Sequence, residues 1–194
     1  KRDRKKGEIM KKSLILLEFK NISTGFFVLD EITKNFNVDI EILRLLCPGR
    51  YMIICSGNQG EIENLRKYIN EIKENEKHKH ITERLVSGVD EELLKKINRN
   101  VKFSDDVKSL GILEFSNTIQ AIETADFIED ESPVEILTIK IGLGMCNKGI
   151  VIFTGDTSSV VNIVERIEKT GLKELISSEV INSPNREFLN NFRF

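Results

Sequence analysis

Among the residue types in this chain, cysteine is the best candidate for a metal ligand, and one of the three cysteines lies in a predicted turn. The segment Cys47-Pro48-Gly49-Arg50 has proline second and glycine third, which favours a type II turn and gives the first side chain a rigid mount. A thiolate held in this way could bind a metal. The same segment also fits a turn cysteine without a metal, and the turn alone does not decide between the two.

Other residues that could do chemistry lack a supporting pattern. The loop 142–149 is rich in glycine, but a dinucleotide-binding loop opens a helix, and here a predicted strand, 150–153, follows. His78 and His80 lie in a charged connector, which fits a solvated linker better than a metal pair. Cys55 has apolar neighbours in a predicted strand and is expected in the core. With only 2 histidines no catalytic constellation can be assembled, so we expect no enzyme activity.

The composition is typical of a cytoplasmic globular protein. Of the 194 residues 40% are hydrophobic, and the net charge of −2 requires neither nucleic acid nor an anionic membrane as a partner. No apolar run approaches the roughly 20 residues that cross a bilayer. The 3 cysteines are too few for a disulfide scaffold. Residues 1–11 begin with a run of basic side chains; we expect a disordered leader, and a tail that binds an acidic partner is the alternative.

The chain repeats itself. Glu18, in the apolar run 14–19, falls on Glu114 in the run 110–115, an offset of 96. Later segments also match, 53–58 with 151–156 at an offset of 98 and 90–94 with 185–189 at an offset of 95. Two copies are too few for a solenoid and indicate a duplicated domain. We expect the domains at 12–107 and 108–194.

Each copy shows the same order of elements. In the first copy the apolar patterns predict strands at 14–19, 38–46, 51–55 and 81–86, and helices over 24–36, after Asn58 and over 90–97. The order β-α-β-β-α-β is the ferredoxin-like split motif with an additional helix, an α/β (α+β) fold. Asn58 and Glu61 predict a capping box at the second helix.

Apolar side chains at helical spacing predict which face of each helix is buried. The expected faces are Phe26, Leu29, Ile32 and Phe36 on the first helix, Ile62, Leu65, Ile69 and Ile72 on the second, and Val160, Ile163, Val164 and Ile167 on the corresponding helix of the second copy.

The doubled motif resembles the bacterial microcompartment shell domain over nearly the whole chain after about residue 12. The residues that resemble it most are 46–51, the Ser56-Gly57-Asn58 turn, and 30–34 before Asn37-Val38. These are similar to the tandem-domain trimeric shell proteins of propanediol-utilisation-type compartments. The resemblance implies an unpermuted domain order and flat tiles in which three chains supply six domains around a central opening, in a shell within the cytoplasm.

The resemblance also implies a site at the tile centre. In the related subgroup the turn that corresponds to Cys47-Pro48-Gly49 points at the threefold axis, where three thiolates hold one iron–sulfur cluster (4Fe-4S) per trimer. The second copy has a loop of Gly142, Leu143, Gly144, Met145 and Cys146 in the equivalent place. Because Cys146 is not aligned with Cys47, we expect it to line the pore and not to bind the cluster.

The chain departs from the family at the expected tile edge. Lys34 matches the edge lysine of the family, but the aligned residue of the second copy is Asp130, in an acidic segment. The edge arginine is replaced by Ser183, and only Pro184 remains of its surroundings. We therefore expect weak self-tiling and a partner among other shell proteins.

Three functions stay open at this point. The chain could be a shell tile whose cluster passes electrons across the shell, with encapsulated redox enzymes as partners. It could be the same tile without a cluster, with a metabolite pore on its axis. It could also be a trimeric regulator that binds a small ligand.

The resemblance implies a homotrimer, because the two domains of one chain supply only a third of the family's six-domain ring. Light scattering on the purified protein should give a mass of about three times the chain mass of 22.2 kDa. A monodisperse monomer would contradict both the trimer and the ring.

Overall fold

We describe the protein from a computed structural model, which covers residues 11–101, 103, 106–131, 133–142, 145 and 147–191. Two compact units emerge, one formed by Lys1–Leu45 with Gly49–Leu94 and the other by Leu46–Pro48 with Lys95–Phe194. The expected leader lies outside the described residues except for Lys11, which already belongs to a strand.

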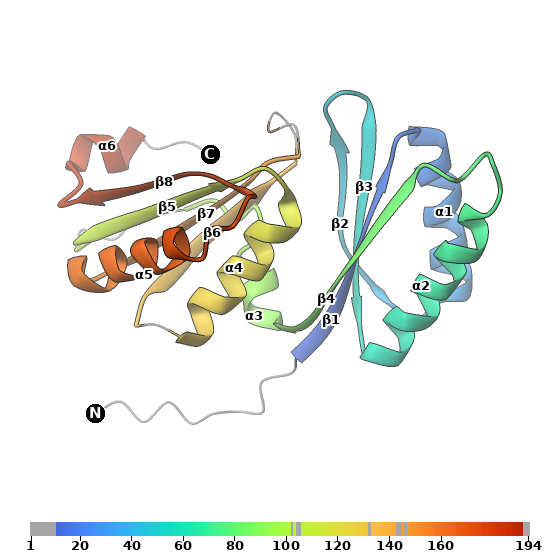
Figure 1. The fold of residues 1–194 in the computed structure, drawn as a ribbon, viewed down its shortest axis with the longest axis horizontal. Coiled ribbons are helices and arrows are strands. Elements are labelled where there is room, and N and C mark those ends of the chain that lie inside the picture. The colour runs from blue at the N-terminus through green and yellow to red at the C-terminus, as the bar shows by residue number, and fades with distance from the viewer. Residues whose placement is uncertain are drawn as a thin grey trace. The chain divides into compact units, whose positions relative to one another are not determined.

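The first copy has the predicted order of elements, with antiparallel pairing of its central strand. The sheet order is β2-β3-β1-β4, and β1 pairs with both β3 and β4. Figure 1 shows two helices side by side on one face of this sheet. The last helix ends at Leu94, earlier than expected. The elements are β1 (Lys11–Phe19), α1 (Ile22–Asn35), β2 (Asp39–Leu46), β3 (Arg50–Gly57), α2 (Gln59–Lys73), β4 (Ile81–Asp90) and α3 (Glu91–Leu94).

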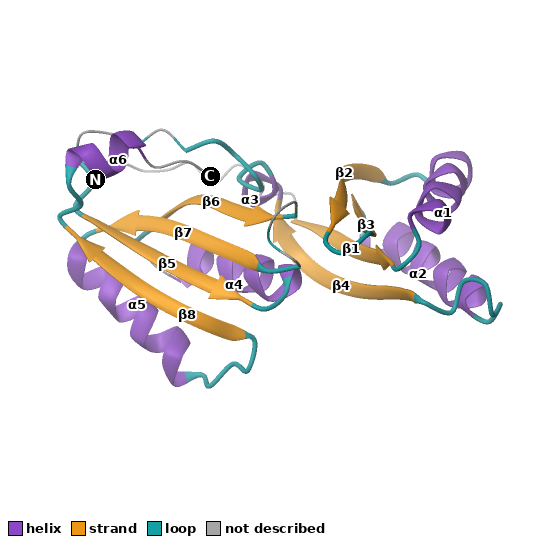
Figure 2. Cartoon of the chain, turned by 90° about the horizontal axis from the view of Figure 1, so that it is seen from above, coloured by secondary structure: helices purple, strands orange, loops and turns teal. Residues whose placement is uncertain are grey.

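The second copy repeats this topology, with a sheet of order β6-β7-β5-β8. Its helices α4 and α5 cover one face, and α6 lies on the other side (Figure 2). The predicted α+β fold of two split motifs is thereby confirmed. Among the described residues no helix is both long and apolar enough to cross a bilayer. The elements are β5 (Ser109–Phe115), α4 (Thr118–Glu131), β6 (Glu135–Ile141), β7 (Gly149–Gly155), α5 (Thr157–Lys169), β8 (Leu175–Asn182) and α6 (Arg186–Asn191).

Local sequence signals determine the helix α2. The Glu61 backbone N–H donates to Asn58 Oδ1 at 3.0 Å, and the Asn58 N–H donates to Glu61 Oε2 at 3.3 Å, which is the predicted capping box. The predicted apolar faces of α2 and α5 are confirmed. Their buried residues are Ile62, Leu65 and Ile69 on α2, with Ile72 partly buried, and Val160, Ile163, Val164 and Ile167 on α5.

The predicted face of α1 is partly wrong. Phe26 is 56% exposed, and the buried residues of this helix include Gly25, Val28 and Ile32. The reason is a close approach at Gly25, where a Cβ would lie 2.4 Å from Tyr51 Cδ1. The helix therefore turns its glycine toward β3, and Phe26 contacts the Tyr51 ring from the flank, with ring centroids 5.1 Å apart.

The two copies fill the space between their central strands in different ways. In the first copy Ile15 pairs with Cys55, and both are fully buried. At the aligned places of the second copy Gly111 pairs with Phe153. A Cβ on Gly111 would lie 2.2 Å from Phe153 Cζ, so the phenyl ring occupies the space that the isoleucine fills in the other copy. The larger side chain of the pair therefore lies on β1 in the first copy and on β7 in the second, while the strand pairing stays the same.

This exchange predicts strong coupling between the two positions. Phe153→Cys leaves a cavity and should cost about 3 kcal/mol, and Gly111→Ile overpacks the same space and should cost about 1–3 kcal/mol. The double variant recreates the Ile15–Cys55 pair, so it should be more stable than additivity predicts by about 1–3 kcal/mol. Urea unfolding of the four proteins measures this coupling. The control combines Gly111→Ile with Val151→Ala, and there the two losses of stability should add. If the losses from Gly111→Ile and Phe153→Cys also added, that result would contradict the exchange of side-chain volume between positions 111 and 153.

Candidate functional site

The turn that carries Cys47 joins the strands β2 and β3. The peptide bond between Cys47 and Pro48 is cis, and Gly49 has a φ of 63°. Nothing lies within 4 Å of a Cβ built on Gly49, so the left-handed backbone conformation, and not lack of space, favours glycine here. Cys47 is exposed and its thiol is free. The turn therefore presents an accessible sulfur at the end of the strand pair.

An ion pair lies at the base of this turn and recurs in the second copy. Arg50 Nη1 lies 3.5 Å from Glu18 Oε2 on the central strand β1. In the second copy Lys148 Nζ lies 2.6 Å from Glu114 Oε1 on β5. Sequence reasoning missed this pair. The repeat offsets contain its signal, because a basic residue and a glutamate recur at aligned positions.

The described residues of one chain do not form a metal site by themselves. Within the described part of the chain there is no group of three His, Cys, Asp or Glu side chains that could hold a metal ion. The exposed Cys47 thiol has the chemistry of one ligand of an iron–sulfur cluster, and the described residues of the same chain do not complete such a ligand set.

Only part of the expected pore loop of the second copy can be placed. Leu143, Gly144 and Cys146 lie outside the described residues. Gly142 has a φ of 105°, and its carbonyl accepts from the Met145 N–H at 3.1 Å. The positive φ at Gly142 is a conformation that glycine adopts without steric cost.

Cys55 is a core residue, as predicted from its apolar neighbours. It is fully buried in the first unit. Burial, together with the charge of Glu41, raises the pKa of this thiol to about 12. The neutral thiol is therefore the form present at physiological pH, and Cys55 has no thiolate available as a metal ligand.

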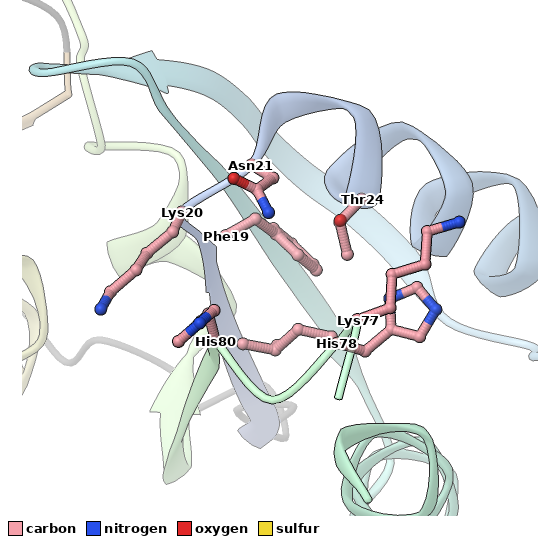
Figure 3. Close-up of a pocket in the computed structure, with 8 residues that line it drawn as sticks. Phe19, Lys20, Asn21, Thr24, Lys77, His78 and His80 are labelled. Atoms are coloured by element: carbon pink, nitrogen blue, oxygen red, sulfur yellow. The ribbon is translucent and has the colours of Figure 1, made fainter. Parts of the chain in front are cut away.

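The two histidines do not form a metal pair. Figure 3 shows their rings on different sides of a small hollow. His78 stacks on Phe27, with ring centroids 5.5 Å apart and planes at 8°. The hollow measures about 10 Å³, the space of a single water molecule. Its lining residues are Phe19, Lys20, Asn21, Thr24, Lys77, His78, His80 and Ile81.

The residues expected at a tile edge lie on the surface or near it. Lys34 Nζ lies 2.5 Å from Asp30 Oδ2 within α1, and both side chains are more than half exposed. Asp130 is exposed near the end of α4. Ser183 follows β8 with a φ of 48°, and Pro184 is half-buried before α6. The role of these four positions, Lys34, Asp130, Ser183 and Pro184, at an edge stays a prediction.

Comparisons with known proteins agree on both copies of the repeat. The BMC domain family matches residues 13–80 and 109–184. The bacterial microcompartment shell protein PduT of Citrobacter freundii is 24% identical over 178 residues, which cover 86% of this chain and 89% of that protein.

Two solved structures share the fold. A microcompartments protein from Desulfitobacterium hafniense DCB is 25% identical, with a TM-score of 0.77, covering 93% of this chain and 99% of that chain. The fused permuted hexameric shell protein MSM0275 from the RMM microcompartment is 16% identical, with a TM-score of 0.54, and the match covers 81% of this chain and 82% of that chain.

The environments of the two described cysteines predict different reactivity. In iron-free protein carrying Cys146→Ser, a maleimide near pH 8 should label Cys47 rapidly, because its thiol is exposed. Cys55 should react only after unfolding in urea, because it is buried and its pKa is raised to about 12. Mass spectrometry counts the labels, and Cys47→Ser is the control that should remove the rapid one. Rapid labelling of Cys55 in the folded protein would contradict this description of the core.

Proposed function

This chain belongs to the BMC domain family of microcompartment shell proteins, and we propose that three copies of it form one shell tile with an iron–sulfur cluster at the centre. The observation that carries the shell function is the double match, at residues 13–80 and 109–184. The predicted resemblance is thereby confirmed.

A shell protein of this family is structural and not an enzyme, and it lies in the shell of a cytoplasmic microcompartment. The expectation of no enzyme activity and the expected location therefore agree with family membership. The chain's own contribution is two α+β domains, each with a four-stranded sheet.

The cluster is proposed from the position and chemistry of Cys47. It is an exposed, free cysteine on a turn between two strands, and each chain supplies one. The aligned positions of the second copy, Leu143 and Met145, carry no cysteine. Three chains around a threefold axis would supply three thiolates, and the fourth iron of a cubane would take another ligand. A cluster bound there would carry single electrons.

The expected partners follow from the tile edge and from the cluster. An exposed Asp130 where the family has lysine favours a neighbouring shell protein with a basic edge over a second copy of this tile. An electron-carrying centre implies redox enzymes inside the compartment as donors or acceptors.

Anaerobic reconstitution with iron and sulfide tests the cluster. The parent protein should become brown and bind about four irons per trimer, because one cubane takes its ligands from three chains. Cys47→Ser should lose colour and iron while keeping the trimer, since packed faces hold the subunits. Iron analysis, absorption and light scattering give the three readouts.

Two variants serve as controls for this experiment. Cys55→Ser and Cys146→Ser should keep the cluster, although the first buries a hydroxyl group and should lose stability. If Cys47→Ser binds as much iron as the parent, or if the parent binds none, the proposed cluster and its electron transfer are contradicted. The alternative that then stands is a shell tile with a pore and no cluster.

A further inference from the structure

The second unit covers one of its own sheet edges with the connector that follows α3. Ile97 forms a parallel bridge with Ile139 of the edge strand β6. The Asn98 N–H donates to the Ile139 carbonyl at 2.8 Å, and the Ile139 N–H donates to the Lys96 carbonyl at 3.1 Å. The Ile141 N–H donates to Asn98 Oδ1 at 3.0 Å. The backbone groups of β6 thereby find partners within the chain.

Side chains hold this connector in place. Thr138 Oγ1 lies within hydrogen-bond distance of the carbonyl oxygens of Lys96 and Arg99, at 3.2 and 3.0 Å, and its single proton is shared between them. Lys96 and Glu129 form an ion pair whose side chains are only 15% and 27% exposed. The segment 96–99 is therefore a built element of the second unit. It makes one β-bridge to β6 and then a turn, in which the Arg99 N–H donates to the Lys96 carbonyl at 3.3 Å and Asn98 has a φ of 55°.

The corresponding strand of the first copy, β2, has no such cover among the described residues. The repeat aligns Leu43 with Ile139 and Leu45 with Ile141. Ile139 and Ile141 are 0% and 4% exposed, whereas Leu43 and Leu45 are 39% and 46% exposed. A surface groove runs along β2, lined by residues 40–44. An uncovered sheet edge with exposed leucines is a template for pairing with another chain.

The repeat also identifies what should cover β2. At the offset of 95 that aligns Leu94 with Leu189, the connector 96–99 corresponds to residues 191–194, which begin with the last residue of α6. Ile97, the bridging residue, then corresponds to Phe192. We propose that residues 191–194 of a second copy of this chain add to the edge of β2 at Leu43, as 96–99 adds to β6 at Ile139.

The sequence of this segment suits that place. In the repeat Phe192 stands at the place of Ile97, so an apolar side chain recurs there. In a strand alternate side chains point to the same side. Leu43 and Leu45 share a face of β2 by the same rule, and they are the exposed apolar residues there. Addition of this segment to the edge would combine main-chain hydrogen bonds with apolar contact between Phe192 and these leucines.

The contact is head-to-tail, because the covered edge belongs to the first copy and the covering segment to the second. Such a heterologous contact generates a closed ring or an open filament. The inference rests on the proposed trimer, in which three such contacts close the ring.

Cross-linking tests the contact directly. In a chain carrying Cys47→Ser and Cys146→Ser, with the buried Cys55 retained, we would introduce Leu43→Cys and Phe192→Cys and treat the protein with a short bismaleimide. A denaturing gel should show covalent species up to three chains and none larger. The matched control replaces Leu43→Cys with Lys67→Cys, on the exposed side of α2, and should show no ladder. Deletion of residues 191–194 should abolish the trimer in light scattering.

The outcomes separate this inference from the shell proposal. A trimeric parent without a ladder above the Lys67 control, or a trimer that survives the deletion, would overturn the inference and leave the tile intact. Covalent species that stop at two chains would overturn the head-to-tail ring. A monomeric parent would overturn both proposals.

Discussion

Between the central strands of each copy, the facing side chains share a space whose size the backbone sets. Ile15 with Cys55 fills it in the first copy, and Gly111 with Phe153 fills it in the second. Close packing tolerates a transfer of bulk across the pair, because the total volume changes little. The position of the helices above the sheet, and of the turns beyond its strands, depends on this filled interior.

The same scaffold then orients two different loops. An ion pair from the central strand to the residue after each loop, Glu18 with Arg50 and Glu114 with Lys148, links the loop to the core. Because these side chains are partly exposed, each pair should stabilise the fold by no more than about 1 kcal/mol. The contribution of each ion pair is to hold the residue that follows the loop beside the central strand. The loops themselves differ, because the first is Cys47-Pro48-Gly49 and the second has no proline, additional glycines and a cysteine at a position that is not aligned with Cys47.

The two copies have thus kept a filled interior, although with different side chains, and they differ more in their exterior. The edge strand β6 is covered by the connector, while the aligned strand β2 is exposed. Glu129 binds Lys96, whereas its aligned position in the first copy is Thr33. These differences let one chain present two unlike surfaces, which a head-to-tail assembly requires. Function in this fold lies in such surfaces and turns and not in the core.

Local signals in the sequence determined the order of elements, the capping box at Asn58, and the buried faces of α2 and α5, because these depend on residues three or four apart. The repeat offsets determined the two-copy architecture, and the sequence Cys47-Pro48-Gly49 singled out the turn at Cys47. The buried face of α1 was decided by the tertiary structure, since Gly25 meets Tyr51, a residue far along the chain, at a helix–strand contact. The Arg50–Glu18 pair and the cover on β6 were decided in the same way. Their partners are brought together only by sheet pairing, which no short window of sequence contains.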